Sequence, residues 1–213
     1  MGKASRTQQT VDNILSTSER LFLERGYEKT TTQAIIDETG IAKGTLFHHF
    51  KSKEDILAAV LERYNGQIAE QMQERLAHAQ GLNAREQIVA LFDWFYDTMG
   101  TAPLSKLAAL SRSPQLIIED LKTWVSQIAP IISELIVQGN RDGSIQTDYP
   151  EEVSQLFNLL FCIWCDPSVL HTTPEGLRRR LQFIQHTMQR LGVDVASDTF
   201  IEKSLVFAQN LYA

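Results

Sequence analysis

Residues that can bind phosphates and base edges lie close together in one short stretch of the chain. Lys43, Gly44, Thr45 and His48 all lie within the segment KGTLFHH. Cationic and hydroxyl side chains in the first turn of a helix donate hydrogen bonds to phosphates and to bases in the major groove of DNA. The segment therefore predicts a nucleic-acid contact. On spacing alone, an ordinary helical hairpin with solvated polar side chains remains an alternative.

The second group of reactive side chains is a pair of cysteines. Cys162 and Cys165 stand three residues apart, which places both thiols on one face of a helix and allows a redox pair. Reactive pairs of this spacing usually lie at a helix start, whereas this segment is apolar nearly throughout. We therefore expect both thiols to pack in the core, with a thiol-based redox regulator as the alternative. His171 lies nearby, but no fourth ligand completes a metal site.

Motifs that would indicate catalysis are absent from the 213-residue sequence. It contains no Walker loop, no G-x-S-x-G, no H-E-x-x-H and no dinucleotide-binding glycine pattern. We therefore predict no catalytic residue, no cofactor and no bound metal. A helical enzyme is kept only as an alternative from a different functional class, without positive support.

The polar stretch at Lys43 is framed by short predicted helices. Apolar residues recur at helical spacing over residues 11–22, and Gly26 stands where a left-handed helix end belongs. A helix of about two turns then begins at the hydroxyl caps of residues 30–32 and ends at Gly40. Two short helices joined by a tight turn form the helix-turn-helix pattern.

The rest of the chain shows helical stripes between breakers and no alternation typical of strands. Ser52 and Asp55 form a capping box, which begins a long helix that connects the head to the body. Pro130 is expected to kink a later helix. The nearly all-apolar segment 151–165 is expected to be a helix buried on most sides. We therefore predict an all-α protein of nine to ten helices.

Charge divides the chain into two parts. The net charge is −6, yet residues 1–53 hold eight Lys/Arg against six Asp/Glu, while residues 54–213 hold twelve against twenty. The acidic body argues against non-specific binding of the protein along nucleic acid. The cationic head can still bind phosphate locally. We predict a three-helix head over residues 1–53 and a larger helical body over residues 54–213.

Targeting signals are not evident in the sequence. The start MGKASRTQQT lacks the apolar stretch of a signal peptide, and the longest apolar run, residues 159–165, is far too short to cross a membrane. Two cysteines are too few to staple a secreted fold of this size. We therefore expect a cytoplasmic protein without a membrane partner.

The head closely resembles the DNA-binding signature of a known family. The segment from Thr31 to Lys53, TTQAIIDETGIAKGTLFHHFKSK, is similar to that of the TetR family of bacterial transcription regulators. This resemblance implies a homodimeric repressor that binds a near-palindromic operator and is released by a small molecule. The DNA contacts that it implies come from Thr31, Thr32, Gln33, Lys43, Gly44, Thr45, Phe47, His48 and Lys53. Phe47 replaces the usual tyrosine, so a phosphate-bonding hydroxyl is missing.

The body is expected to hold an effector and to dimerise. An aromatic cluster predicts a pocket for a small apolar or aromatic molecule, although any single aromatic is more often plain core. The predicted lining is Phe92, Trp94, Phe95, Tyr96, Met99, Trp124, Phe161 and Trp164. The resemblance suggests that the last large helices pair with their copies, through Phe157, Leu160, Leu181, Ile184 and Met188. A constitutive DNA-binding protein without a ligand is the alternative.

Overall fold

The computed structural model describes residues 2–99, 102, 103, 105 and 114–212. These residues form helices and no strands, which confirms the prediction of an all-α fold. Counting each uninterrupted run once, there are nine helices among them. The segments are α1 (Gly2–Arg25), α2 (Thr32–Thr39), α3 (Lys43–His49), α4 (Lys53–His78), α5 (Ala84–Met99), α7 (Pro114–Thr123), the π-helical η1 (Trp124–Ile128), α8 (Ala129–Asp142), α9 (Pro150–Leu159), the π-helical η2 (Leu160–Trp164), α10 (Pro174–Arg190) and α11 (Asp198–Tyr212).

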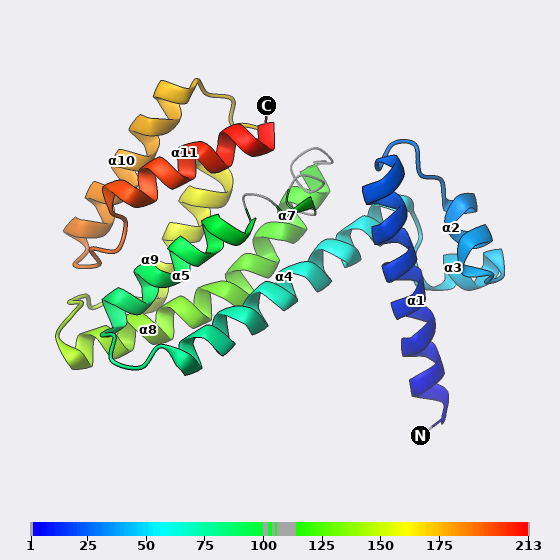
Figure 1. Ribbon diagram of the computed structural model, residues 1–213, viewed down its shortest axis with the longest axis horizontal. Helices are drawn as coiled ribbons and strands as arrows, with labels where there is room; N and C mark the ends of the chain where they lie inside the picture. The colour runs from blue at the N-terminus through cyan, green and yellow to red at the C-terminus, as the bar shows by residue number, and fades with distance from the viewer. Residues whose placement is uncertain (1, 100–101, 104, 106–113, 213) are drawn as a thin grey trace.

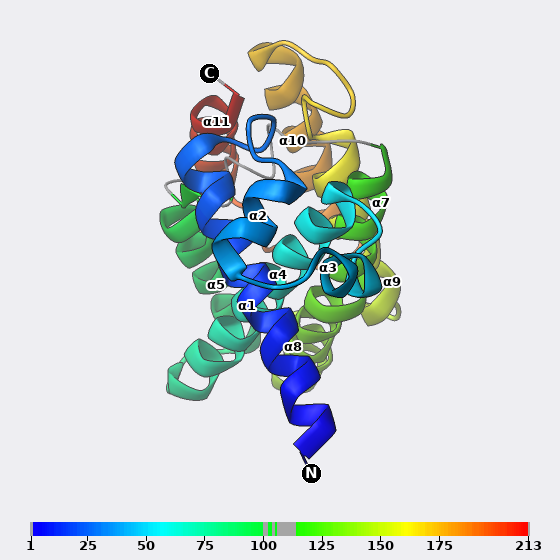
Figure 2. The ribbon, with the colours of Figure 1, turned by 90° about the vertical axis from the view of Figure 1, so that its right-hand side faces the viewer.

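The helices form a small head and a larger body (Figure 1). Helices α1 to α3 make the head at one end of the molecule, and α5 to α11 make the body. Helix α4 runs from the head along the body and joins the two (Figure 1). Viewed from the head end, α2 and α3 stand in front of the body helices (Figure 2).

Local capping explains the boundaries of the head helices. Gly26 and Gly40 have positive φ angles of 83° and 68°, so each can end a helix in the left-handed conformation. The hydroxyl of Thr30 is buried and donates to the carbonyl of Gly26 at 2.9 Å, which fixes the turn between α1 and α2. The hydroxyl of Thr31 accepts from the backbone N–H of Ala34 at 3.1 Å and caps α2.

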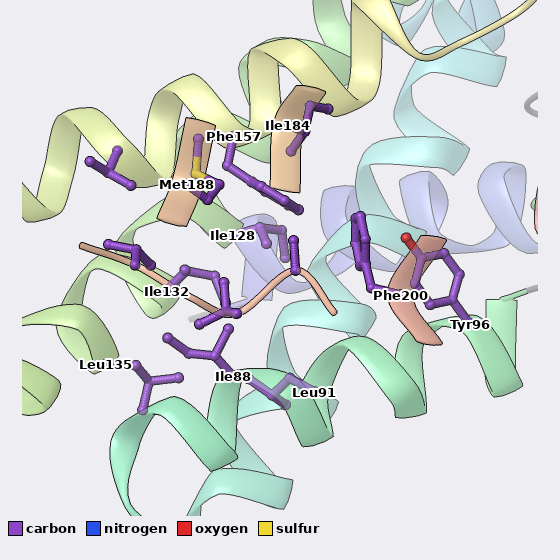
Figure 3. Packing of buried hydrophobic residues seen from close by; sticks show 14 of the residues in the cluster. Ile88, Leu91, Tyr96, Ile128, Ile132, Leu135, Phe157, Ile184, Met188 and Phe200 are labelled. Carbon is purple, nitrogen blue, oxygen red and sulfur yellow. The ribbon is translucent and has the colours of Figure 1, made fainter. Parts of the chain in front are cut away.

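Helix α4 contributes to two separate hydrophobic clusters. At its start, the predicted cap is confirmed, because the Ser52 hydroxyl accepts from the Asp55 N–H at 3.1 Å. Its first turns place Ile56 and Leu57 in the head cluster, and its later turns place Ile68 in the body cluster. Figure 3 shows part of the body cluster, where side chains from α5, α8, α9, α10 and α11 converge.

Two π-helical turns interrupt the body helices. Pro130, which was expected to kink a helix, stands in the first turn of α8, directly after the π turn η1. Proline has no backbone N–H, so it cannot complete the regular hydrogen-bond ladder of the preceding turn. The second π turn, η2, continues α9 without a break. Such turns are rare and frequently lie at functional sites.

The apolar segment 151–165 is not buried on most sides, contrary to the expectation from its composition. Leu156 and Leu159 are 36% and 44% exposed. The helix has one face in the core of its own chain, where Val153 and Phe157 are buried, and it presents a second apolar face to solvent. Periodicity could not reveal this second face, because every residue from Leu156 to Cys165 except Asn158 is apolar.

Gly192 gives a test of how tightly the end of α10 packs. Gly192 and Gly143 both have φ of 80°, but an added Cβ would overlap the Gln146 carbonyl at Gly192 and would meet nothing at Gly143. We expect Gly143→Ala to lower the free energy of unfolding by roughly 1–2 kcal/mol, the usual penalty of a left-handed non-glycine residue. Gly192→Ala should lower the free energy of unfolding clearly more. Urea unfolding of both variants checks this, and equal losses would contradict the packing argument.

Candidate functional site

Helix α3 presents most of the predicted DNA-contacting side chains on one surface. Lys43, Gly44 and His48 are exposed, and Phe47 is 40% exposed. The Lys43 ammonium lies 5.9 Å from the centre of the Phe47 ring, so the two side chains share one patch. Leu46 is fully buried and anchors the opposite side of the helix in the head cluster. An exposed cationic face on a buried anchor suits a helix that docks into a groove.

The start of α2 supplies the second part of this surface. Thr31 and Gln33 are exposed and Thr32 is half-buried. The first N–H groups of a helix attract phosphate, because they lack partners within the helix and the helix dipole is positive there. The Gln33 amide donates to the Asp37 carboxylate at 2.7 Å, which holds its side chain along α2.

Lys53 is more closely engaged within the head than the family resemblance implied. Its ammonium donates to the backbone carbonyl of Tyr27 at 2.9 Å and lies 4.1 Å from the centre of the Tyr27 ring. Burial, followed by the nearby Glu54 carboxylate, raises the pKa of the Tyr27 hydroxyl. Lys53 therefore ties the start of α4 to the end of α1, a role that the sequence did not predict.

A cavity of about 120 Å³ lies in the body, next to the head. Helices α4, α5, α7, α10 and α11 and both π turns contribute to its wall. Its lining is mainly aromatic and aliphatic, which suits an apolar ligand. The lining residues are Leu61, Tyr64, Asn65, Ile68, Phe95, Met99, Ser105, Asp120, Trp124, Phe161, Cys162, Cys165, Asp166, Leu177, Leu181, Ser204, Phe207 and Ala208.

Half of the predicted pocket residues line this cavity. They are Phe95, Met99, Trp124 and Phe161. The other four pack elsewhere: Phe92 stacks on Phe157, Trp94 lies against Arg75, the Tyr96 hydroxyl bonds to Ser204 and Trp164 meets Phe183 on the outer surface. The aromatic pattern lies around a cavity, but it could not separate the rings that line the cavity from the rings that pack in the core.

The cavity also contains polar groups that the sequence pattern did not indicate. The Tyr64 hydroxyl donates to the Met99 sulfur at 3.0 Å and lies 3.3 Å from the Ser105 hydroxyl. Burial raises the pKa of Tyr64. The Asn65 amide, which is only 5% exposed, donates to the Asp120 carboxylate at 2.8 Å. The sequence offered one sign of these polar groups, because Asn65 stands among the apolar positions of α4.

Helices α4 and α7 each connect this cavity to the head. In α4, Leu61 lies in the head cluster and also lines the cavity. In α7, Leu116 is buried in the head cluster, and Asp120, one turn later, lines the cavity. The Asn65–Asp120 hydrogen bond joins the two helices at this level. A change in the cavity wall would therefore reach the packing of the head.

The predicted dimer residues lie mostly inside the chain. Phe157, Leu181, Ile184 and Met188 are at most 8% exposed and belong to the body cluster. Leu160 is half-buried. The apolar side chains that α9 and α10 expose are different ones, notably Leu156, Leu159 and Phe183, which are 36%, 44% and 55% exposed. The predicted residues thus lie on the inward faces of these helices, and the dimer interface itself stays a prediction.

The three consecutive arginines of α10 do not form a separate cationic patch. Arg178 makes two contacts with the Glu202 carboxylate, at 2.5 and 3.2 Å. The Arg180 guanidinium donates to the backbone carbonyls of Trp164 and Leu170. Both arginines thus hold α10 against its neighbours in the same chain.

Comparison with known proteins agrees with the head geometry. Residues 14–60 match the model of the family described as bacterial regulatory proteins, tetR family. The HTH-type transcriptional repressor KstR2 of Rhodococcus jostii is 29% identical over 160 residues, which cover 73% of this chain and 76% of the relative. The head is that of a TetR-like regulator.

Solved structures show the same fold over the whole body of this TetR-like chain. The structure of RolR in complex with resorcinol covers 95% of this chain and 96% of its own, with a TM-score of 0.68 and 13% identity. Thermus thermophilus FadR in complex with lauroyl-CoA covers 82% and 92%, with a TM-score of 0.61 and 19% identity. At these identities the likeness establishes the fold only.

Two negative findings apply to the described residues alone. No helix among them is long and apolar enough to span a membrane. Within the same residues, no group of three or more His, Cys, Asp or Glu side chains is arranged to hold a metal ion.

The cysteines line the cavity with different exposure, which predicts different reactivity. Cys165 is 6% exposed, and burial raises its pKa to about 12, while Cys162 is half-buried. The thiolate is the nucleophile, so Cys165 should remain an unreactive thiol at pH 8. We expect iodoacetamide to alkylate Cys165→Ser, which keeps Cys162, much faster than Cys162→Ser. Intact mass measured over time checks this, and faster alkylation of Cys165 would contradict it.

Proposed function

We propose that the protein is a ligand-responsive repressor that binds operator DNA as a homodimer, with residues 1–53 as the DNA-binding part and residues 54–213 as the sensing and dimerising part. The observation that carries this proposal is the shared packing of α4 and α7, which place Leu61 and Leu116 in the head cluster next to the cavity. A ligand that rearranges the cavity wall would change the position of the head relative to the body.

The cavity favours an apolar or aromatic effector. Relatives of the same fold have been solved with resorcinol and with lauroyl-CoA, which are ligands with an aromatic ring and a long apolar chain. The lining of the present cavity, with Phe95, Trp124 and Phe161, offers similar apolar surface. This lining supports an effector-binding protein over a constitutive DNA-binding one. The buried, protonated state expected for Cys165 speaks against a redox pair.

Derepression then follows from differential affinity. Operator DNA favours the spacing of two heads that matches one helical turn between half-sites, or a multiple of it. An effector that binds better to another arrangement of α4 and α7 shifts the population away from that spacing. A tenfold loss of operator affinity needs about 1.4 kcal/mol of differential affinity.

The homodimer is proposed to form through the exposed apolar side chains of α9, η2 and α10. Trp164 of η2 and Phe183 of α10 meet edge to face, with ring centres 5.4 Å apart, so the two helices present one continuous apolar surface. Leu156 and Leu159 extend this surface along α9. A second copy related by a two-fold axis would bury the same patch on both chains.

Reciprocal binding tests the sensing function. A compound that lowers operator affinity tenfold must itself bind operator-saturated protein tenfold more weakly, because linkage is symmetric. The operator can be selected from random DNA, its binding followed by anisotropy, and compound binding followed by tryptophan emission. Trp124→Phe is the control, because it removes the cavity-lining tryptophan. Compounds that bind the cavity without changing operator affinity would favour a constitutive DNA-binding protein.

Lys43 tests the placement of α3 on DNA. Lys43→Ala should weaken binding to all DNA sequences and should reduce the slope of log affinity against log salt by about 0.9 for each phosphate that is no longer neutralised. Lys122→Ala is the matched control, because Lys122 is an exposed lysine of α7 paired with Glu119. Titrations between 50 and 200 mM salt, a range over which DNA-binding proteins commonly weaken by about 10³–10⁵ in affinity, make the change measurable. An unchanged slope for Lys43→Ala would count against this placement.

Phe183 tests the proposed dimer surface. Phe183→Glu places a charge in the centre of the patch, so we expect a monomer that binds operator weakly. Val206→Glu on α11 is the matched control, because Val206 and Phe183 are 54% and 55% exposed. Sedimentation velocity gives the oligomeric state of each variant. A dimeric Phe183→Glu variant, or a monomeric Val206→Glu variant, would place the interface elsewhere.

A further inference from the structure

A second hollow lies beside the effector cavity, and the two share part of one wall. This outer chamber has a volume of about 440 Å³ and lies between α10, α11 and the turn that follows η2. Leu177 of α10 and Ala208 of α11 line both the outer chamber and the effector cavity. These two side chains therefore mark the boundary between an inner apolar space and an outer one.

Hydrogen bonds hold the turn at this boundary in place. Asp166 lines the inner cavity, and Ser168 lines the outer chamber. The Ser168 N–H and hydroxyl donate to the Asp166 carboxylate at 2.8 and 2.6 Å. The N–H of Leu170 donates to the Asp166 carbonyl at 3.0 Å. These hydrogen bonds hold the turn in one defined position between the two spaces.

The two spaces differ in the hydrogen-bond donors that they offer. On the inner wall, the Tyr64 hydroxyl donates to the Met99 sulfur, and the Asn65 amide donates to Asp120. These inner donors are already engaged. The outer wall carries the imidazole of His171, the hydroxyl of Thr172 and the amide of Gln209, and His171 and Gln209 are exposed. Among the described residues that line the outer chamber, none is a carboxylate.

We propose that the effector is an amphiphilic carboxylic acid that spans both spaces. Its apolar chain fills the inner cavity between the aromatic rings, where it is removed from water. Its carboxylate lies in the outer chamber, where His171, Thr172 and Gln209 supply donors to an acceptor-only group. This inference rests on the proposed sensing function and adds the chemical class and the orientation of the ligand.

Three eight-carbon probes with different head groups test the class. Isothermal titration calorimetry at pH 7.5 compares octanoate, octanol and octylamine, which share one apolar chain. We expect octanoate to bind at least tenfold more tightly than octylamine, with octanol between them. Octylamine binding as tightly as octanoate, or no binding by any probe, would overturn the proposal.

Variants of the outer wall test the orientation. His171→Leu and Gln209→Leu should each weaken octanoate binding severalfold and leave octanol binding within twofold. His186→Leu is the matched control, because His186 is an exposed histidine of α10 outside both linings. Circular dichroism and thermal unfolding confirm that each variant is folded. If octanoate and octanol lose affinity equally, or if neither variant changes octanoate affinity, the carboxylate does not lie in the outer chamber.

Operator binding separates this inference from the function on which it rests. Octanoate that binds with the expected selectivity but leaves operator affinity unchanged would support the ligand class and contradict sensing through this ligand. Other compounds that bind the inner cavity and release the operator, while octanoate does not bind, would overturn the ligand class and leave the sensing function intact.

Discussion

The whole molecule depends on one helix that is buried in two hydrophobic cores. Helix α4 begins at a capped Ser52, places Ile56 in the head cluster and places Ile68 in the body cluster. Each of these two isoleucine side chains is at most 2% exposed. Because a regular helix transmits displacement along its axis with little bending, the head cannot change its position without changing how α4 packs on the body. The Arg63–Glu19 ion pair, at 2.6 Å, additionally joins α4 to α1.

The cavity borders α4 between the parts of the helix that pack in the head cluster and in the body cluster. Between its two buried ends, α4 carries Tyr64 and Asn65, whose polar atoms bond to Met99 and Asp120 instead of filling space. Side chains that border a void have fewer dispersion partners than side chains in a filled core, so an occupant of the void stabilises the arrangement of the wall that contacts it best. A ligand that fills the void supplies those partners in one arrangement only. The ligand then selects one arrangement of the cavity wall through packing contacts alone, without any chemical step.

The success of prediction from the sequence followed the range of the interactions involved. The head helices could be predicted because their signals are local: Gly26 and Gly40 end helices, and Thr31 and Ser52 begin them through bonds to residues three positions away. The cavity could be predicted only in part, because its wall combines residues from α4 to α11. Rings as close in sequence as Phe95 and Tyr96 have different roles, one in the lining and one in the core. No local pattern distinguishes them.

The burial of the residues predicted to face a partner has the same physical origin. In segment 151–165, the buried Phe157 directly follows the exposed Leu156, and both are large and apolar. Hydrophobic periodicity finds a core face by contrast with a polar face, and a helix with two apolar faces offers no contrast. A helix that must satisfy its own core and a partner at once has to be apolar nearly all round. From Leu156 onward this helix carries apolar side chains nearly all round, and together with the exposed Phe183 on the neighbouring α10 this supports the proposed dimer surface.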